Sequence, residues 1–241
     1  MELVSKSEAS TMDGLSDQVR WLAAAPVYAL AYGCGLLVFA WMARRRGLAT
    51  AGIWLLMQAA LFGGLVGANL AQLLATGLPG KTIEGGFIGG YIAVVLMKRH
   101  LGITRPTGDL FGLAFPAGEA IGRIACFVGG CCYGKATTIA LAVHDHGAQR
   151  YPTQLYMSAC AAASFAFLLW LERKHRLPEN ALFYTQGILF CMTRFIIEFF
   201  RDGSTFAGNL TLAQFGCIAG FAFFAYKFVQ LIRAQLSLVN A

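Results

Sequence analysis

Residues 21–46 read WLAAAPVYALAYGCGLLVFAWMARRR, and this stretch decides the class of fold. Its apolar part, Trp21–Ala43, carries no charged side chain and reaches the roughly 20 residues that an α-helix needs to cross a bilayer. Three arginines, at 44–46, follow it directly. Positive clusters of this kind stay on the cytoplasmic side, so the stretch predicts a membrane helix that starts outside and ends inside.

The composition of the whole chain agrees with this prediction. Of the 241 residues, 57% are hydrophobic and only 13% are charged, whereas a soluble domain of this size needs more charges to cover its surface. Three further uncharged runs reach spanning length: Ala51–Gly80, Tyr151–Leu171 and Gly203–Tyr226. We therefore predict an integral membrane protein.

The net charge of +7 does not indicate a nucleic-acid partner. The cations fall at the ends of apolar runs in the alternating manner of a topology signal, for example at Lys98–Arg99 and Arg173–Arg176. Residues 1–20 lack the basic start, short apolar core and small-residue cleavage site of a secretory signal peptide. The first span is therefore expected to be retained, with membrane lipid around it and no nucleic acid bound.

Three weaker spans complete the predicted bundle. The third is expected to start near Lys81, the fourth to cover about 109–128 and the sixth about 181–200. The predicted fold class is an all-α polytopic membrane protein of about seven transmembrane helices, with the N-terminus outside and the C-terminus inside. We expect a polar segment over residues 1–20, one transmembrane catalytic domain over 21–233, and an extracytoplasmic loop over 129–150.

Charged residues inside these spans are the strongest functional signal. The topology places six of them at one depth, toward the extracytoplasmic side: Glu84, Glu119, Arg123, Arg194, Glu198 and Arg201. Intramembrane charges are costly and mark functional sites, and three arginines suit a bound phosphate. A phospholipid head group is therefore the expected ligand. The alternative is a set of ion pairs that hold the bundle together, in which three carboxylates neutralise three cations and leave no anion site.

Residues 122–134, GRIACFVGGCCYG, gather three cysteines, and two histidines follow in the next loop: Cys126, Cys131, Cys132, His144 and His146. The spacing is neither C-x-x-C nor that of a zinc finger, so no metal site is predicted. On an oxidising face, a disulfide from Cys126 to Cys131 or Cys132 is the alternative.

Four stretches together resemble the prolipoprotein diacylglyceryl transferase family of bacterial inner membranes. GRIACFVGGCCYGK (122–135) resembles its signature segment, and YPTQLY (151–156) its histidine-proline-serine-glutamine-leucine-tyrosine motif. TRFIIEFFRDG (193–203) is similar to its arginine-glutamate-arginine segment, and TIEGGFIGG (82–90) to its histidine-glycine-glycine segment. The four stretches come in family order and cover about residues 50–225.

The resemblance implies a transferase that moves the diacylglyceryl group of phosphatidylglycerol onto the thiol of a lipobox cysteine and releases glycerol phosphate. It implies an inner-membrane location with the active site toward the extracytoplasmic side, and no cofactor. Arg123 and Arg194 match the arginines that hold the phosphodiester and stabilise the leaving phosphate. Glu198 matches the carboxylate that orients its partner arginine, and Arg201 a further basic position.

Several positions depart from the family pattern. Glu84 stands in place of the histidine before Gly-Gly, Cys126 in place of the signature asparagine, and Cys131 in place of a glutamate. Tyr151 replaces the first histidine of the QLY motif, and Met157 follows it where a glutamate is usual. The expected catalytic residues are Glu84 as base, Arg123, Arg194 and Glu198. The expected substrate-binding residues are Arg201, Glu119, Tyr151, Gln154, Tyr156, Gly85, Gly86, Cys126 and Cys131.

Two other functions stay open from the sequence. The first is a related phosphatidylglycerol-dependent transferase whose acceptor is a glycan hydroxyl, a small molecule or water, with transfer of the phosphoglycerol head group as one form. The second is a lipid-binding or transport bundle in which the charges line a pathway. Against transport, the sequence shows no internal repeat and no pair of broken helices.

Overall fold

The computed structural model describes residues 2–78, 80, 82–175 and 177–239. Within these ranges it holds seven helices and one two-stranded hairpin. The helices are α1 (Glu2–Arg45), α2 (Ala51–Thr76), α3 (Ile83–His100), α4 (Gly108–Val128), α5 (Thr153–Lys174), α6 (Ala181–Glu198) and α7 (Leu212–Val239). The antiparallel strands are β1 (Val143–Asp145) and β2 (Ala148–Arg150). The prediction of a helical fold is confirmed, with a small hairpin added in the loop after α4.

In the part of the chain that the structure describes, five helices are long and apolar enough to cross a membrane. They are Gln18–Arg45, Ala51–Leu74, Gly108–Val128, Thr153–Lys174 and Leu212–Ser237. Large apolar side chains on them are exposed, among them Leu22 and Leu74. Apolar surface of this extent suits contact with lipid tails. The protein is therefore a membrane protein with several spanning helices.

Two boundaries differ from the sequence prediction. Helix α1 begins at Glu2, so residues 2–20 of the polar segment continue the helix of the first span. That segment contains a single glycine and no proline, so nothing in its backbone stops a helix. The predicted start of the third span near Lys81 lies outside the described residues, and α3 begins at Ile83, where the Thr82 hydroxyl caps it by accepting the Gly85 N–H at 3.2 Å.

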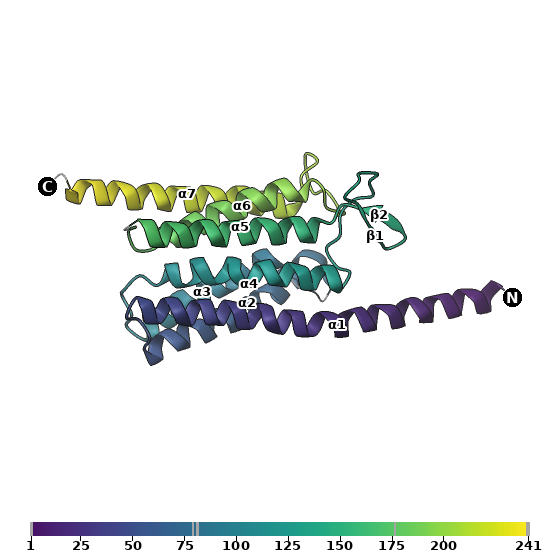
Figure 1. Ribbon diagram of the computed structural model, residues 1–241, viewed down its shortest axis with the longest axis horizontal. Helices are drawn as coiled ribbons and strands as arrows, with labels where there is room; N and C mark the ends of the chain where they lie inside the picture. Colours follow the sequence, from purple (N-terminus) through teal and green to yellow (C-terminus); the bar gives the residue numbers. More distant parts are fainter. Residues whose placement is uncertain (1, 79, 81, 176, 240–241) are drawn as a thin grey trace. The chain divides into compact units, whose positions relative to one another are not determined.

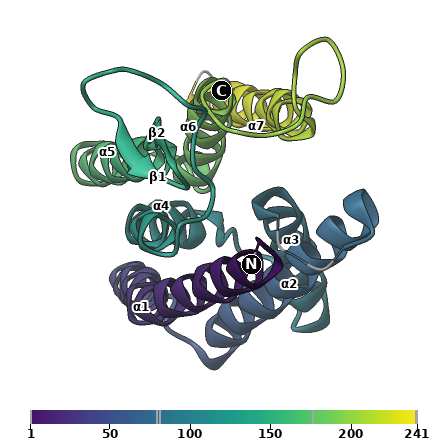
Figure 2. The same ribbon diagram turned by 90° about the vertical axis from the view of Figure 1, so that its right-hand side faces the viewer.

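The chain divides into two compact units, each described here by itself. Unit 1 comprises Met1–Phe39 and Gly108–Ala241, and unit 2 comprises Ala40–Thr107. Within unit 1, α4 packs against α5 and α6, and α6 packs against α7 (Figure 1). In Figure 2, helices α4 to α7 are seen roughly along their axes. Helix α1 packs on α4 through the Phe39 and Phe111 rings, whose centroids are 5.0 Å apart.

A reciprocal cap joins the starts of α4 and α6. The Asp109 carboxylate accepts the backbone N–H of Asn180 at 2.9 Å and that of Phe183 at 3.2 Å. In return, the Asn180 side-chain oxygen accepts the Gly108 N–H at 2.9 Å. These bonds satisfy N–H groups that a helix start leaves without partners. They also fix the two helices in a common register, and this register positions the site described below.

In unit 2, α2 and α3 pack at close range through glycines. A Cβ added to Gly67 would lie 2.8 Å from the Gly89 Cα and closer still to the Gly85 carbonyl oxygen. At Gly64, on the same helix, an added Cβ would stay 3.4 Å from its nearest neighbour, the Gly86 carbonyl oxygen. Small residues at such an interface let two helix backbones approach closely in lipid.

Candidate functional site

Helices α4 and α6 bring the intramembrane charges of unit 1 to one height. From Asp109 to Arg123 and from Asn180 to Arg194 the chain advances by fourteen residues in each case, a rise of about 21 Å along either helix. Because Asp109 and Asn180 are bonded to each other, both arginines reach the same level. The cap between Asp109 and Asn180 thus gives a physical reason for predicting these two arginines at one height.

The first charged pair lies within α4. The Nε and Nη2 atoms of Arg123 donate to one carboxylate oxygen of Glu119, at 3.2 and 3.1 Å. The two residues are one helical turn apart, and both side chains are less than 10% exposed. A charge buried to this degree is costly unless it is paired, and the pairing holds the guanidinium group in one orientation.

The second charged group is centred on Glu198 at the end of α6. Its Oε2 atom pairs with Nη1 of Arg194, and Nη1 of Arg201 lies 3.6 Å from the same oxygen. The other carboxylate oxygen, Oε1, accepts the Thr211 hydroxyl at 3.2 Å. Glu198 thus links two arginines to the segment before α7.

The two groups act on each other, because Glu119 of α4 also interacts electrostatically with Arg194 of α6. In this cluster of five side chains the cations exceed the carboxylates by one: Glu119, Arg123, Arg194, Glu198 and Arg201. An excess of one positive charge matches the single negative charge of a phosphodiester. We call these five residues the arginine cluster.

Two loops close over the end of unit 1 that carries the arginine cluster. Gly134, after α4, forms a bridge with Arg201, after α6, and the Lys135 N–H donates to the Phe200 carbonyl at 2.9 Å. The guanidinium of Arg150 bonds to the Asp202 carboxylate at 2.7 Å and lies over the Tyr133 ring at 4.6 Å. These contacts fix the backbone that carries Arg201.

The three cysteines of the loop gather beside the arginine cluster. The sulfur atoms of Cys126, Cys131 and Cys132 lie within 4.8 Å of one another. Arg123 and Arg201 interact electrostatically with the Cys132 sulfur. At the other side of the group, the Tyr28 hydroxyl lies 3.2 Å from the Cys126 sulfur. All three cysteines are free thiols, so the structure shows no disulfide between them. We call these three residues the cysteine triad.

Hydrogen bonds within the triad move the thiol pKa values apart. Hydrogen bonds from Cys126 and Cys131, together with the positive charges of Arg201 and Arg123, lower the pKa of Cys132 below its ordinary value. The pKa of Cys131 is raised, first by its hydrogen bonds with Cys126 and Cys132 and then by burial. Cys132 is therefore the thiol in the loop that holds a negative charge most readily.

The other predicted site residues fall into two groups. Gln154 is buried and donates to the Cys131 carbonyl at 2.8 Å, and Tyr151 packs on the Phe200 ring with 5.3 Å between centroids. Tyr156 is half-buried on α5. The remaining predicted residues belong to unit 2: Glu84, Gly85 and Gly86 lie in the first turns of α3. Gly85 lies against α2, where an added Cβ would meet the backbone of that helix.

The two loop histidines are not part of the cysteine group. Among the described residues, the only set of His, Cys, Asp and Glu side chains close enough to hold a metal ion is the cysteine triad. His146 instead lies 3.1 Å from the Asp145 carboxylate and stacks on the Tyr133 ring at 4.4 Å. Of the five residues considered in the sequence, the structure therefore groups only the three cysteines.

A family model described as prolipoprotein diacylglyceryl transferase matches residues 18–230. The chain belongs to this family. The match includes all of the arginine cluster and all of the cysteine triad.

Curated relatives in the transferase family carry the name phosphatidylglycerol–prolipoprotein diacylglyceryl transferase. One from Campylobacter curvus is 29% identical over 127 residues, which cover 52% of this chain and 47% of that protein. One from Clostridioides difficile is 33% identical over 147 residues, which cover 61% of this chain and 59% of that protein. One from Oleidesulfovibrio alaskensis is 27% identical over 230 residues, which cover 83% of this chain and 84% of that protein. The chain spans about half of the length of the first of these relatives and most of the length of the third.

Several residues that support the transferase site were not predicted. Thr211 and Gln214 form a reciprocal cap at the start of α7, in which the Gln214 side-chain oxygen accepts the Thr211 N–H at 2.9 Å and the Thr211 hydroxyl accepts the Gln214 N–H at 3.3 Å. Their T-x-x-Q spacing is a capping-box signal that the sequence does show. Tyr28 gives no such signal, because it lies in a uniformly apolar run.

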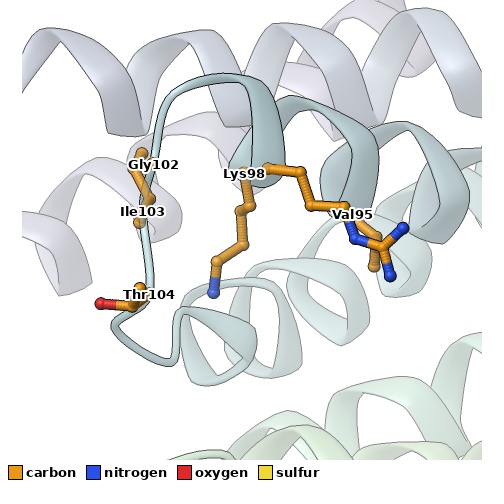
Figure 3. Close-up of a pocket in the computed structure, with 6 residues that line it drawn as sticks. Val95, Lys98, Gly102, Ile103 and Thr104 are labelled. Atoms are coloured by element: carbon orange, nitrogen blue, oxygen red, sulfur yellow. The ribbon is translucent and has the colours of Figure 1, made fainter.

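A pocket in unit 2 is lined by none of the residues predicted for the transferase site. It is formed by the end of α3 and the turn after it, and Figure 3 shows Lys98 and Thr104 on its wall. The Lys98 amine donates to the Arg105 carbonyl at 2.7 Å, which holds the turn against the helix. None of the residues that line the pocket carries a carboxylate.

Proposed function

We propose that this chain is a membrane transferase that takes phosphatidylglycerol as donor and transfers its diacylglyceryl group to a cysteine thiol of a prolipoprotein, releasing glycerol phosphate. The observation that carries this proposal is the arginine cluster, in which buried Arg123 and Arg194 stand at one height with one excess positive charge. The names of the curated relatives support the same donor and acceptor.

The proposed setting is the bacterial inner membrane. Seven transmembrane helices, with the N-terminus outside and the C-terminus inside, would form one catalytic domain over 21–233, preceded by the segment 1–20. The loop 129–150, with its hairpin, would lie on the extracytoplasmic side together with the arginine cluster. The cation groups at 44–46, 98–99 and 173–176 support this orientation, since they fall at the opposite helix ends.

In the proposed reaction the acceptor thiolate attacks the glyceryl carbon that bears the phosphate. A C–S bond forms, the C–O bond breaks, and its electron pair leaves with the phosphate oxygen as glycerol phosphate. The thiol proton passes to a base or to solvent. Arg123 and Arg194 bind the phosphodiester and stabilise the second negative charge that develops on the leaving phosphate. Glu119 and Glu198 keep these guanidinium groups in place, and Arg201 stands at the entrance.

The remaining roles follow the family pattern. Glu84 is proposed as the base that accepts the thiol proton, in the position where the family has histidine. Gly85 and Gly86 would let backbone approach the donor lipid. Cys126, Cys131, Tyr151, Gln154 and Tyr156 would line the donor and acceptor side.

A different acceptor is the second candidate function. The observation that favours it is the replacement of family asparagine, glutamate and histidine by Cys126, Cys131 and Tyr151 around the same arginines. A glycan or small-molecule hydroxyl would then take the place of the lipoprotein thiol, with the donor unchanged.

One assay separates these functions. The purified protein in detergent receives phosphatidylglycerol labelled in its glycerol head group, with a lipobox peptide or with the same peptide carrying serine for cysteine. Glycerol phosphate released only with the cysteine peptide supports the proposed function. Release of labelled head group onto another acceptor, with diacylglycerol left behind, supports the second candidate. Failure to turn over the lipid with the cysteine peptide contradicts the proposed function. Failure to turn it over when a sugar or glycerol acceptor is added as well contradicts the second candidate.

A further inference from the structure

The cysteine triad is held together by the chain around it. Cys126 belongs to the last turn of α4, and Cys131 and Cys132 follow in the turn after the helix. The Cys131 N–H donates to the Cys126 carbonyl at 3.1 Å, which folds the turn back on the helix. The carbonyls of Cys131 and Cys132 accept the side chains of Gln154 and Thr153, at 2.8 and 2.9 Å. The backbone of the triad is therefore fixed from both sides.

The backbone at Cys132 has a left-handed conformation, with φ of +62°. Such a conformation is uncommon for a residue other than glycine and persists where the surrounding structure imposes it. Adjacent residues of an extended chain point to opposite sides. Here, the left-handed conformation of Cys132, after Gly130 with φ of +68°, brings two adjacent sulfur atoms to the side of Cys126.

We propose that Cys126, Cys131 and Cys132 bind one Zn²⁺ ion through three thiolates, and that the fourth coordination position is open to an external thiol. Zinc–sulfur bonds of about 2.3 Å in a tetrahedron place the sulfur atoms about 3.8 Å apart. The three sulfur atoms already lie within 4.8 Å of one another, so side-chain rotations close the remaining gap.

The ligand set determines the type of site. Structural zinc sites usually have four protein ligands, whereas sites with three protein ligands leave a position for water or substrate. His144 and His146 do not join the triad, and among the described residues no other metal ligand lies within its range. Three sulfur ligands also favour a thiophilic ion such as zinc over magnesium or calcium.

The charges around the triad suit this site. Three thiolates and one Zn²⁺ carry a net charge of −1, which neighbouring guanidinium groups can stabilise. Arg123 and Arg201 interact electrostatically with Cys132, so the opposite charges are adjacent. The Tyr28 hydroxyl, at 3.2 Å from the Cys126 sulfur, can hydrogen bond to that ligand and orient it.

The open position has a direct use in the reaction proposed above, and this part of the inference rests on that function. An acceptor thiol that binds Zn²⁺ would lose its proton more readily, to Glu84 or to solvent, and would stay nucleophilic as a thiolate. When its sulfur bonds to the glyceryl carbon, the C–O bond breaks and the electron pair leaves with the phosphate. The product is a thioether, which binds zinc less well than a thiolate and can leave.

Metal content tests the site without any lipid. The full-length protein is purified in detergent with reductant, equilibrated with Zn²⁺ and desalted, and its metal is measured by mass spectrometry. We expect one zinc per chain in the wild type and in Cys34→Ser, a matched cysteine in α1 outside the triad. We expect at least a tenfold loss in Cys131→Ser and in the triple variant Cys126→Ser, Cys131→Ser, Cys132→Ser. A wild-type protein that binds no zinc, or a triple variant that retains it, would contradict the proposed zinc site.

Cobalt substitution tests the ligands and the open position. With Co²⁺ in place of zinc, three thiolates predict strong sulfur-to-cobalt charge-transfer absorption that Cys131→Ser weakens. N-acetylcysteine methyl ester should shift this spectrum, and N-acetylserine methyl ester should not. A spectrum that the thiol leaves unchanged overturns the open position. Equal elution of the variants on size exclusion shows that they are folded.

The failure of this inference is distinguishable from the failure of the proposed function. Zinc and cobalt binding are measured without phosphatidylglycerol, whereas diacylglyceryl transfer is measured with it. A protein that binds one zinc and responds to the thiol without transferring the lipid keeps the metal site and loses the proposed function. A protein that transfers the lipid with no bound metal loses the metal site and keeps the function.

Discussion

The Asp109 carboxylate accepts the backbone N–H of Asn180 at 2.9 Å, and this bond sets α4 and α6 in register. Arg123 and Arg194 follow at equal distances along the two helices, so a contact about 21 Å away determines the height at which the two guanidinium groups stand. A residue outside the site thus decides its geometry.

Replacing Asp109 should therefore disturb both stability and turnover. Asp109→Ala leaves the N–H groups of Asn180 and Phe183 without their acceptor, at a cost of about 1–3 kcal/mol each when buried. We expect a lower melting temperature in detergent and a lower rate of lipid turnover. The control is Lys174→Ala, which removes an exposed side chain at the end of α5 and should change neither quantity. An Asp109→Ala protein with unchanged melting and turnover would show that the cap does not set the register.

The glycines between α2 and α3 provide a matched pair of tests. Gly67→Ala places a methyl group into the backbone of α3, whereas Gly64→Ala places one at a distance of 3.4 Å. Overpacking of this kind costs about 1–3 kcal/mol, so Gly67→Ala should melt at a clearly lower temperature and Gly64→Ala close to the wild type. Equal melting of the two variants would contradict the close packing at Gly67.

The thiols of the triad should differ in reactivity in the reduced, metal-free protein. The ordinary pKa of a cysteine is about 8.5, and that of Cys132 lies below it while that of Cys131 lies above it. Because the thiolate is the reactive form, alkylation of Cys132 by iodoacetamide should continue as the pH falls below 8.5, while alkylation of Cys131 should be slow even above it. Mass spectrometry of digested peptides after short labelling measures both rates. A faster Cys131 would contradict the assigned order.

Substitutions of Glu84 test whether this residue takes part in transfer to the acceptor. If Glu84 serves as the base, Glu84→Gln should lower transfer to the lipobox peptide by about 10²-fold or more. Glu84→His restores the residue that the family has at this position, and we expect transfer to the peptide to rise above the wild-type rate. The same rate in wild type, Glu84→Gln and Glu84→His would remove Glu84 from the reaction.

Much of the fold could be predicted because the apolar runs and their flanking cations are local features of the sequence. The uncharged run Ala51–Gly80 contains helix α2, which begins at the same residue and ends at Thr76, and the common height of Arg123 and Arg194 was predicted by counting along the spans. Contacts between distant residues could not be predicted in the same way. The cap of Asp109 on Asn180 and the approach of Tyr28 to Cys126 depend on how helices pack, and a single sequence does not show this.

The cysteines show the same limit. Their spacing argued against a metal site, because the common zinc motifs place ligands at fixed intervals along the chain. The structure groups the three sulfur atoms through a left-handed residue at Cys132, which no spacing rule anticipates. The two histidines considered with these cysteines do not join them, and His146 lies beside the Asp145 carboxylate.

The central claim is that Arg123 and Arg194 bind and stabilise the phosphate of the donor lipid. Its most direct measurement is the rate of glycerol phosphate release from labelled phosphatidylglycerol with the cysteine lipobox peptide, for the wild type, Arg123→Ala and Arg194→Ala. We predict a loss of about 10²–10³-fold in each variant. Arg173→Ala, which removes an exposed arginine in the last turn of α5, is the control and should keep most of the activity. Rates near the wild type in Arg123→Ala or Arg194→Ala, in protein that still elutes as folded, would contradict the account.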